Sequence, residues 1–275
     1  MKTTLFAHIL NEEILLPSWL NHHKKLFSHG VIMDCGSTDK SIQIINDICP
    51  TWEIIQLTND EIKSMDIQKI EDMESKTDGW KCALNVSEYL IIDDLNRYLK
   101  EFENNNPNSI GVRATGIIIV DQPNNTSIQQ FNDPNLMLKK NYGYVEFGRA
   151  WNGEFREDGI FPTTTTVYRS RLIHKNKTGE YTAGRHDTRL SVSIDPNLYI
   201  AWIGRGSPEL YSKRCNIWKH PPSGILLFHG NYYNIMSNTD LAFKFWGAEV
   251  MKSINIFDNI PKYRRYLEIL YGTML

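Results

Sequence analysis

The sequence predicts an α/β fold with a mostly parallel central sheet flanked by helices. Short apolar runs of strand length alternate with segments whose apolar residues recur at helical spacing, and this alternation is typical of a doubly wound parallel sheet. With 275 residues, 41% of them hydrophobic and 23% charged, the chain can bury a substantial core. It has no internal repeat or low-complexity linker, so we expect a single domain over residues 1–275.

The first half of the chain predicts a series of strand and helix pairs. Three predicted strands cover residues 3–10, 30–33 and 52–57, and a fourth begins at residue 80. The first predicted helix begins near residue 16, and two others cover 42–48 and 60–74. The first helix starts near Leu16, because Pro17 is tolerated only in a first helical turn. Strands and helices that alternate at this spacing form a parallel sheet.

The second half of the chain is less regular. We expect a helix over 91–98, strands over 110–120 and 224–228, and closing helices over 240–254 and 261–271. Asp93 and Asp94 could bind a metal, but we favour a role at the helix start, where the helix dipole stabilises negative charge. Residues 121–197 mix aromatics, glycine and charge, which suits either a wall that stacks on a sugar or core packing.

Polar residues interrupt an apolar run between Trp80 and Leu90. If this stretch is one extended strand, Asn85 and Ser87 point the same way near its carboxyl end, while Cys82, Leu84 and Val86 face a core. Ligands of open α/β sheets bind beyond the carboxyl ends of the strands. We therefore expect a binding site at this strand tip.

The same stretch resembles the Asp-x-Asp-Glu-Phe-Leu pattern of family 2 glycosyltransferases, which have the GT-A fold. The matching residues are Asn85, Val86, Ser87, Glu88, Tyr89 and Leu90. In the family, the two leading carboxylates hold a divalent metal against the diphosphate of a sugar nucleotide. Here both are replaced by neutral side chains, and hard cations prefer charged oxygen ligands. The resemblance therefore implies a Mn²⁺ or Mg²⁺ site that is weakened or dispensable, with Glu88 and His229 as candidate ligands.

The turn over residues 34–39 follows the second predicted strand. Asp34 and the small residues after it could approach a base or ribose, or Ser37, Thr38 and Asp39 could simply begin the next helix. The turn resembles the Asp-x-Gly-Ser-x-Asp sequence of family 2 enzymes. This resemblance implies that Asp34 contacts the nucleoside half of the donor.

Asn11 and Glu12, followed by Trp19 and the pair His22 and His23, are similar to a pattern in a subgroup of these enzymes. On their own, the two histidines are expected at the surface or in the core. Adjacent residues on a helix diverge by about 100° and cannot easily chelate one ion.

The predicted strand over 224–228 ends at His229, where a hydrogen-bonded structural histidine is the usual role. In the same subgroup, a late strand ends in His, followed by an aromatic residue, a Ser, and a helix containing Lys and Gly. The matching residues here are His229, Tyr232, Ser237, Lys244 and Gly247, with Gly230 inserted after the histidine.

The turn over residues 184–187 stands out in the irregular middle of the chain. Arg185 could pair with a diphosphate, and Asp187 could accept the proton of an attacking hydroxyl, although the segment could equally be only a polar turn. The candidates for catalysis are Asp187 as the base and His186 beside it, with Glu157 and Asp158 as competitors.

The resemblance implies an inverting glycosyltransferase that moves a sugar from a nucleotide-sugar donor, expected to be a UDP-sugar, to a hydroxyl of a glycan or other acceptor. Residues 1–120 would be the nucleotide-binding half of one GT-A-like domain, and residues 121–275 the acceptor-binding half with the C-terminal helices. The implied donor-binding residues are His8, Asn11, Glu12, Asp34, Ser37, Asn85, Ser87, Arg185 and Lys244.

Two other functions share parts of this pattern. A degenerate transferase would bind a sugar nucleotide or glycan without turnover. A nucleotidyltransferase would use a similar sheet, but the chain lacks the Gly-rich, basic first loop that holds a triphosphate.

Composition argues against other classes of partner and compartment. The net charge of -2 provides no basic field for nucleic acid. The four cysteines show no C-x-x-C spacing, so we expect free thiols in a reducing compartment. No run reaches the roughly 18 apolar residues of a transmembrane helix, and polar residues follow the first strand too early for a signal peptide. We therefore expect a cytoplasmic protein without a transmembrane segment.

Overall fold

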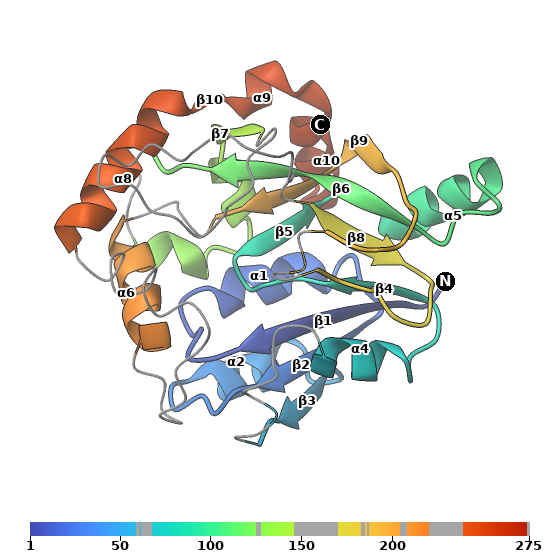
Figure 1. Ribbon diagram of the computed structural model, residues 1–275. Helices are drawn as coiled ribbons and strands as arrows, with labels where there is room; N and C mark the ends of the chain where they lie inside the picture. Colours follow the sequence, from blue (N-terminus) through green and yellow to red (C-terminus); the bar gives the residue numbers. More distant parts are fainter. Residues whose placement is uncertain are drawn as a thin grey trace.

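A computed structural model describes residues 1–58, 61, 68–124, 128–145, 170–182, 185, 187–203, 208–219 and 239–273. It shows a central sheet flanked by helices, which confirms the predicted α/β fold (Figure 1). Ten strands of the described residues belong to this sheet. The predicted strand over 224–228 and the aromatic residues between 146 and 169 lie outside the described residues.

The first four strands form the parallel part of the sheet. They are β1 (Thr3–Ile9), β2 (His29–Asp34), β3 (Glu53–Gln56) and β4 (Trp80–Ala83). β1 pairs in parallel with both β2 and β4, and β2 pairs in parallel with β3. β1 is buried along its whole length, as expected for an inner strand of a parallel sheet that is covered on both faces.

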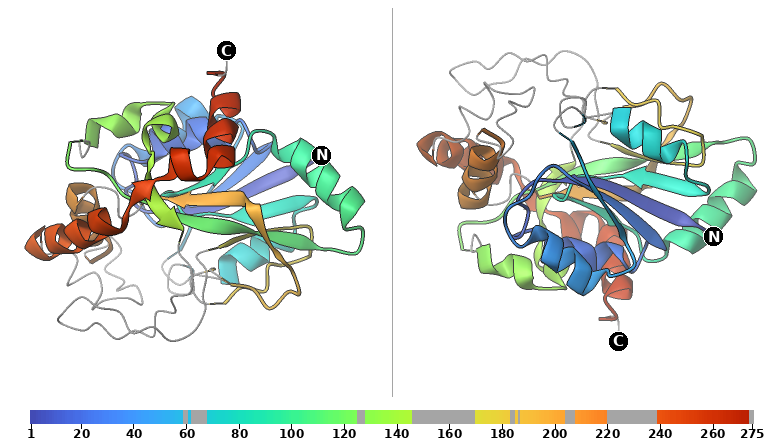
Figure 2. Two further views of the ribbon diagram at one scale, coloured as in Figure 1. Left: turned by 90° about the horizontal axis from the view of Figure 1, so that it is seen from above. Right: turned by 90° about the horizontal axis from the view of Figure 1, so that it is seen from below.

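Helices connect these strands as the sequence predicts. They are α1 (Leu16–His23), α2 (Ser41–Ile48) and α4 (Gln68–Glu74). Pro17 lies in the first turn of α1, where its missing N–H breaks no helical hydrogen bond. α1 and α2 cover one face of the sheet and α4 lies on the other (Figure 2). Apolar side chains accordingly form two core clusters, one containing Trp19 and the other Ile70.

The later strands add mainly antiparallel pairs. They are β5 (Glu88–Ile91), β6 (Gly111–Ile119), β7 (Tyr142–Val145), β8 (Arg171–His174), β9 (Ile194–Trp202) and β10 (Ile254–Asn255). β8 joins the two halves of the sheet, because it pairs antiparallel with β4 on one side and with β6 on the other. β6 also pairs antiparallel with β7 and parallel with β9. β6 therefore runs in the same direction as β1 and β4.

The other helices lie in the second half of the chain. They are α5 (Leu95–Asn105), α6 (Pro208–Lys219), α8 (Thr239–Lys252), α9 (Ile256–Asn259) and α10 (Pro261–Leu270), with 3-10 turns η1 (Ile128–Asn132) and η2 (Leu136–Lys139). Asp94 caps α5 by accepting a hydrogen bond from the backbone N–H of Arg97 (2.9 Å), and Asp93 pairs with the Arg97 side chain (2.6 Å). The acidic pair thus has the predicted role at the helix start. The predicted bounds of 91–98 are wrong, because Ile91 belongs to β5 and α5 begins at Leu95.

One prediction is wrong, because residues 80–90 do not form a single extended strand. β4 ends at Ala83, the chain turns, and β5 begins at Glu88. The Glu88 N–H donates to the Asn85 carbonyl (2.9 Å), and the Asn85 N–H donates to the Glu88 carboxylate (2.8 Å). β5 then pairs antiparallel with β9. Asn85 and Ser87 consequently belong to a turn between two strands rather than to one face of a strand.

Two expectations from composition can be compared with the structure. Cys35, Cys49 and Cys82 are free and buried, as predicted, whereas the side chain of Cys215 lies outside the described part of the chain. Burial raises the pKa of Cys35 to about 12, so this thiol stays protonated and unreactive at neutral pH. Over the described residues, no helix is both long and apolar enough to cross a membrane.

Candidate functional site

The carboxyl ends of β1, β2 and β4 lie at one edge of the sheet, because these strands are parallel neighbours. A loop follows each strand, over residues 10–15, 35–40 and 84–87. Ligands of open α/β sheets bind beyond this edge. The three loops, together with Arg185, which contacts the third loop, define the candidate site.

Side chains connect the loops that follow β1 and β2. Asn11 adopts a φ of 53°, a left-handed conformation that asparagine tolerates better than most residues. Its Oδ1 accepts a hydrogen bond from Thr38 N (2.7 Å), and its backbone N–H donates to Ser37 Oγ (3.0 Å). Asp34, only 1% exposed, accepts from Ser37 N through Oδ1 (3.0 Å). The predicted residues Asn11, Asp34 and Ser37 are thus brought together.

A second set of contacts ties the same loops to α2. The backbone N–H of Glu12 donates to Ser41 Oγ (2.9 Å). Asp39 accepts from Ser41 N through Oδ1 (2.9 Å) and from Glu13 N through Oδ2 (3.0 Å). Asp39 therefore supports the start of α2, which is one of the two roles considered for this turn. These contacts fix the shape of the paired loops.

Glu88 forms a buried ion pair with Arg171, the first residue of β8. Arg171 Nε donates to Glu88 Oε2 (2.7 Å) and Arg171 Nη2 contacts Oε1, with the side chains only 1% and 3% exposed. Burial opposes ionisation of the Glu88 carboxyl group, but the Arg171 guanidinium and the Asn85 N–H hold the pKa of Glu88 below its usual value. Glu88 is therefore an anion with both oxygens already engaged.

Asn85 links this ion pair to Arg185. Its Nδ2 donates to Glu88 Oε1 (3.3 Å), and its Oδ1 accepts from Arg185 Nη2 (2.6 Å). Arg185 is 3% exposed and has a φ of 56°, a conformation that costs free energy in a residue with a Cβ. A second buried guanidinium is thus held against the β4–β5 turn.

His8 lies on β1 near the same edge and is only 8% exposed. Burial, and then the charge of Arg185, keeps the pKa of His8 well below its usual value, so the ring is neutral at pH 7. Its Nε2 is buried and has no hydrogen-bond partner among the residues that the structure describes. A buried polar atom in this state costs free energy unless a ligand or water supplies a partner.

Ser87 makes contacts with β9 rather than with Arg185. Its Oγ accepts from Trp202 Nε1 (3.0 Å), and its carbonyl accepts from Ile203 N (2.9 Å). Ser87 is 2% exposed. The expectation that Ser87 and Asn85 point the same way is therefore wrong, because it depended on an extended strand.

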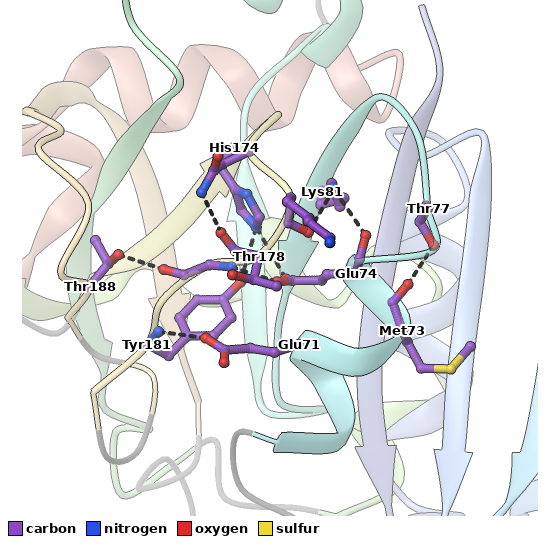
Figure 3. A network of polar contacts seen from close by, with 12 residues as sticks. Glu71, Met73, Glu74, Thr77, Lys81, His174, Thr178, Tyr181 and Thr188 are labelled. Atoms are coloured by element: carbon purple, nitrogen blue, oxygen red, sulfur yellow. Dashed lines mark hydrogen bonds and ion pairs between the residues drawn. The ribbon is translucent and has the colours of Figure 1, made fainter.

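Figure 3 shows the polar network that holds the segment before Arg185 against α4. Glu74 is fully buried; its Oε1 accepts from Tyr181 Oη (2.7 Å) and contacts His174 Nε2 (3.1 Å). Its Oε2 accepts from the backbone N–H of Gly179 (2.7 Å). Arg185 follows a few positions later, and its backbone N–H donates to the Thr182 carbonyl (2.9 Å), so this network holds the segment to which Arg185 is attached.

Asp187 is anchored to β6. Its Oδ1 contacts Arg113 Nη1 (2.8 Å) and accepts from Thr188 N (2.8 Å), and its side chain is 40% exposed. Arg113 pairs in register with Leu172, next to Arg171 on β8. Asp187 thus lies on the β6 side of the site, with a carboxylate that is partly open to solvent.

Several predicted residues cannot be placed in this site. Lys244 is exposed on α8. His186, Glu157, Asp158, His229, Tyr232 and Ser237 lie outside the described residues.

His22 and His23 support the fold. His22 Nε2 contacts the Leu90 carbonyl (2.8 Å), and His23 Nε2 accepts from Leu90 N (3.3 Å). Trp19 Nε1 donates to the Glu88 carbonyl (2.9 Å). β9 pairs with one edge of β5, and these α1 side chains satisfy backbone groups at the other edge. The core role considered for the histidines is confirmed.

The residues at the β4–β5 turn do not fit the metal site implied by the resemblance. Asn85 Oδ1 is bonded to a guanidinium, Ser87 Oγ accepts from Trp202, and both Glu88 oxygens contact Arg171. Among the described residues, no group of three or more His, Cys, Asp and Glu side chains could hold a metal ion. The proposed ligand Glu88 is instead one half of an internal ion pair.

Sequence reasoning missed Arg171 and Trp202. Arg171 begins the short segment Arg-Leu-Ile-His, in which all four residues are buried. A charged residue in such a segment requires a buried partner of opposite charge. The sequence shows Arg171 beside two apolar residues, but it does not identify Glu88 as the partner, because the two residues are separated by 83 positions.

No family model and no curated protein matches this chain. Among solved structures, residues 1–349 of S. aureus TarS are 13% identical over 98% of this chain and 80% of that chain, with a TM-score of 0.39. The same TarS fragment in complex with UDP matches 44% of this chain and 36% of that chain at 15% identity, with a TM-score of 0.34. HddC from Yersinia pseudotuberculosis is 11% identical over 78% of this chain and 99% of that chain, with a TM-score of 0.38. At these scores the similarities establish neither a ligand nor an activity for this chain.

Proposed function

We propose that the chain is a glycosyltransferase that moves a sugar from a nucleotide-sugar donor to a hydroxyl of a glycan or other acceptor, with inversion at the anomeric carbon. The observation that carries the proposal is the meeting of the loops after β1, β2 and β4 at one edge of the sheet. These loops contain residues of three of the four patterns that resemble family 2 glycosyltransferases. A chance resemblance in sequence would not require the three patterns to be neighbours in the fold.

We assign the nucleoside half of the donor to the loops after β1 and β2. Asp34 and Ser37 lie there, and Asn11 fixes the two loops against each other. An ionised carboxylate can accept about four hydrogen bonds, so the contact of Asp34 with Ser37 N leaves capacity for a ribose hydroxyl or a base N–H. Glu12 lies beside them in the loop after β1, with its N–H bonded to α2.

We assign the donor diphosphate to the β4–β5 turn. Arg185 provides positive charge there, Asn85 holds its guanidinium, and His8 provides a neutral ring nitrogen beside it. Charge-assisted hydrogen bonds from a guanidinium suit phosphate oxygens. Ser87 and Lys244 remain assigned to the donor on the resemblance alone, and a UDP-sugar remains the expected donor on the same basis.

We propose Asp187 as the general base. Its carboxylate would take the proton of the acceptor hydroxyl while that oxygen forms a bond to the anomeric carbon. The bond from this carbon to the diphosphate breaks, and the diphosphate leaves with the electron pair. The 40% exposure of Asp187 leaves the carboxylate accessible, and Arg113 keeps it in place.

The base is tested by Asp187→Asn. We expect turnover to fall by about 10²-fold or more, while the dissociation constant of the donor barely changes. The measurements are single-turnover transfer rates and calorimetric titration with the same sugar nucleotide. Full turnover in this variant would contradict the role of Asp187 and favour Asp158 as the base.

The proposed function as a whole is tested with a panel of sugar nucleotides. Each is added to the full chain with chelator or with Mn²⁺, and the melting temperature is recorded, because a ligand that binds only the folded state raises it. We expect one class of sugar nucleotide to raise the melting temperature and to serve as a donor for a hydroxyl acceptor. If every sugar nucleotide leaves the melting temperature unchanged in both conditions, the proposal is wrong. Binding without transfer would indicate a protein that binds a sugar nucleotide without turnover.

A further inference from the structure

The β4–β5 turn has the arrangement of an anion site rather than of a metal site. Its oxygen atoms are already directed at cations of the protein: Asn85 Oδ1 at Arg185, and the Glu88 carboxylate at Arg171. A divalent ion placed at these oxygens would have to displace both guanidinium groups. It would also meet their repulsion, because both are buried and poorly screened by water.

The balance of charge at the turn supports the same conclusion. Asn85 and Ser87 are neutral, and burial keeps His8 uncharged. Carboxylates at positions 85 and 87, as in the resembling pattern, would add two negative charges beside Glu88. Those charges would have to be offset by a cation before the turn could accept a diphosphate, and the neutral side chains remove that requirement.

We infer that the buried guanidinium group of Arg185, held in place with the help of Arg171, replaces the divalent cation, so that the site binds the donor diphosphate as a metal-free anion. This inference rests on the proposed function and gives the two residues different tasks. Arg185 is the cation nearest the ligand. Arg171 is a positioning residue, because it holds the Glu88 carboxylate. That carboxylate in turn accepts hydrogen bonds from the backbone N–H and the side-chain amide of Asn85.

The surroundings of Arg185 are consistent with a fixed charge. The Glu74 network on α4 holds the preceding residues, and Asn85 holds the guanidinium itself. A charge that is already in place in a low-dielectric environment stabilises an anion without reorganisation when the ligand arrives. The left-handed backbone conformation of Arg185 costs free energy, and such a conformation persists only where surrounding contacts hold the residue in place.

The inference is tested by titrating the full chain with UDP and with inorganic pyrophosphate, each in chelator and in Mn²⁺. We expect the same affinity for UDP in both conditions. Arg185→Gln should weaken UDP binding about ten- to a hundredfold, the effect of losing a hydrogen bond to a charged group, and Mn²⁺ should not restore it. Arg185→Lys keeps the charge and should retain part of the affinity. The melting temperature of each variant without ligand reports whether it folds.

Arg189→Gln provides a matched control. It removes the same positive charge as Arg185→Gln, but from an exposed residue on the same segment. It should bind UDP as the unmodified chain does. UDP binding that requires Mn²⁺ would overturn the inference and leave the proposed function standing, and so would Mn²⁺-dependent rescue of Arg185→Gln. If neither UDP nor pyrophosphate binds in either condition, the inference is wrong, and the panel of sugar nucleotides then decides separately whether the proposed function stands. The comparison in the unmodified chain remains decisive if Arg185→Gln does not fold.

Discussion

The two sides of β5 use polar side chains in different ways. On the α1 side, Trp19, His22 and His23 bond to backbone groups of Glu88 and Leu90. These contacts complete the hydrogen bonding of a strand edge, and both histidines are fully buried. These side chains are therefore engaged in hydrogen bonds that stabilise the fold.

At the β4–β5 turn, side chains bond mainly to side chains from other segments. Glu88 contacts Arg171 on β8, and Asn85 contacts Arg185 on the segment after it. These two contacts join side chains to side chains and do not satisfy backbone groups of a strand edge. The comparison teaches that buried polar residues with backbone partners point to structural roles, whereas buried charges that converge from several segments on one loop point to a binding site.

The largest expected effect concerns Glu88, because its carboxylate is one half of a buried ion pair with Arg171. Glu88→Gln should lower the free energy of unfolding by about 3–5 kcal/mol, as found when one partner of a buried ion pair is removed. Urea denaturation measures this loss. In the matched control, Glu268→Gln removes the partner of Arg264, whose side chain is 52% exposed, and should cost at most about 1 kcal/mol. Equal losses in the two variants would contradict the view that burial makes the Glu88 pair special.

Much of the fold could be predicted because local patterns determine it. The alternation of apolar strands and amphipathic helices gave β1 to β4 with α1 and α2, and the acidic pair at Asp93 and Asp94 marked the start of α5. The break between β4 and β5 could not be predicted. Both strands are apolar, and β5 is defined by pairing with β9, a strand that begins more than 100 residues later in the chain.

The site could be predicted only in part for the same reason. Asn11, Asp34 and Ser37 follow strands directly, so their place at one edge of the sheet follows from topology. The partners of Asn85 and Glu88 come from β8 and its following segment. No short-range pattern connects residues so far apart, and Arg171 was therefore missed.

The structural role of the α1 side chains can be tested through the pH dependence of the free energy of unfolding. Burial lowers the pKa of His22 to about 4, and the nearby Lys25 adds to this effect. In the unfolded chain the ring regains its ordinary pKa of about 6.5, so between these values the unfolded state binds more protons. The stabilisation is complete above pH 6.5 and is lost as the pH falls toward 4, by up to about 3 kcal/mol.

His22→Gln checks this assignment because glutamine has no titrating group. The difference in free energy of unfolding between the unmodified chain and the variant should shrink by up to about 3 kcal/mol from pH 7 to pH 4. Denaturation at a series of pH values measures it. The fully buried neighbour His23 is present in both proteins, so its titration cancels to first order. A constant difference across this range would show that His22 titrates as a solvent-exposed histidine does.

The smallest effect is expected just beyond β5, where Asp93 and Asp94 form a third polar group of the same region. Asp94 accepts a hydrogen bond from Arg97 N at the start of α5 (2.9 Å), so Asp94→Ala should lower the free energy of unfolding by about 1 kcal/mol. Asp93→Ala removes a pair with Arg97, whose side chain is 56% exposed, and should cost about 0.5 kcal/mol or less. Because both carboxylates serve the helix start, neither variant should change the affinity for UDP with or without Mn²⁺. A loss of UDP binding in either variant that occurs only with Mn²⁺ would place a metal site at this acidic pair. Carboxylates at a helix start would then have a binding role as well as a structural one.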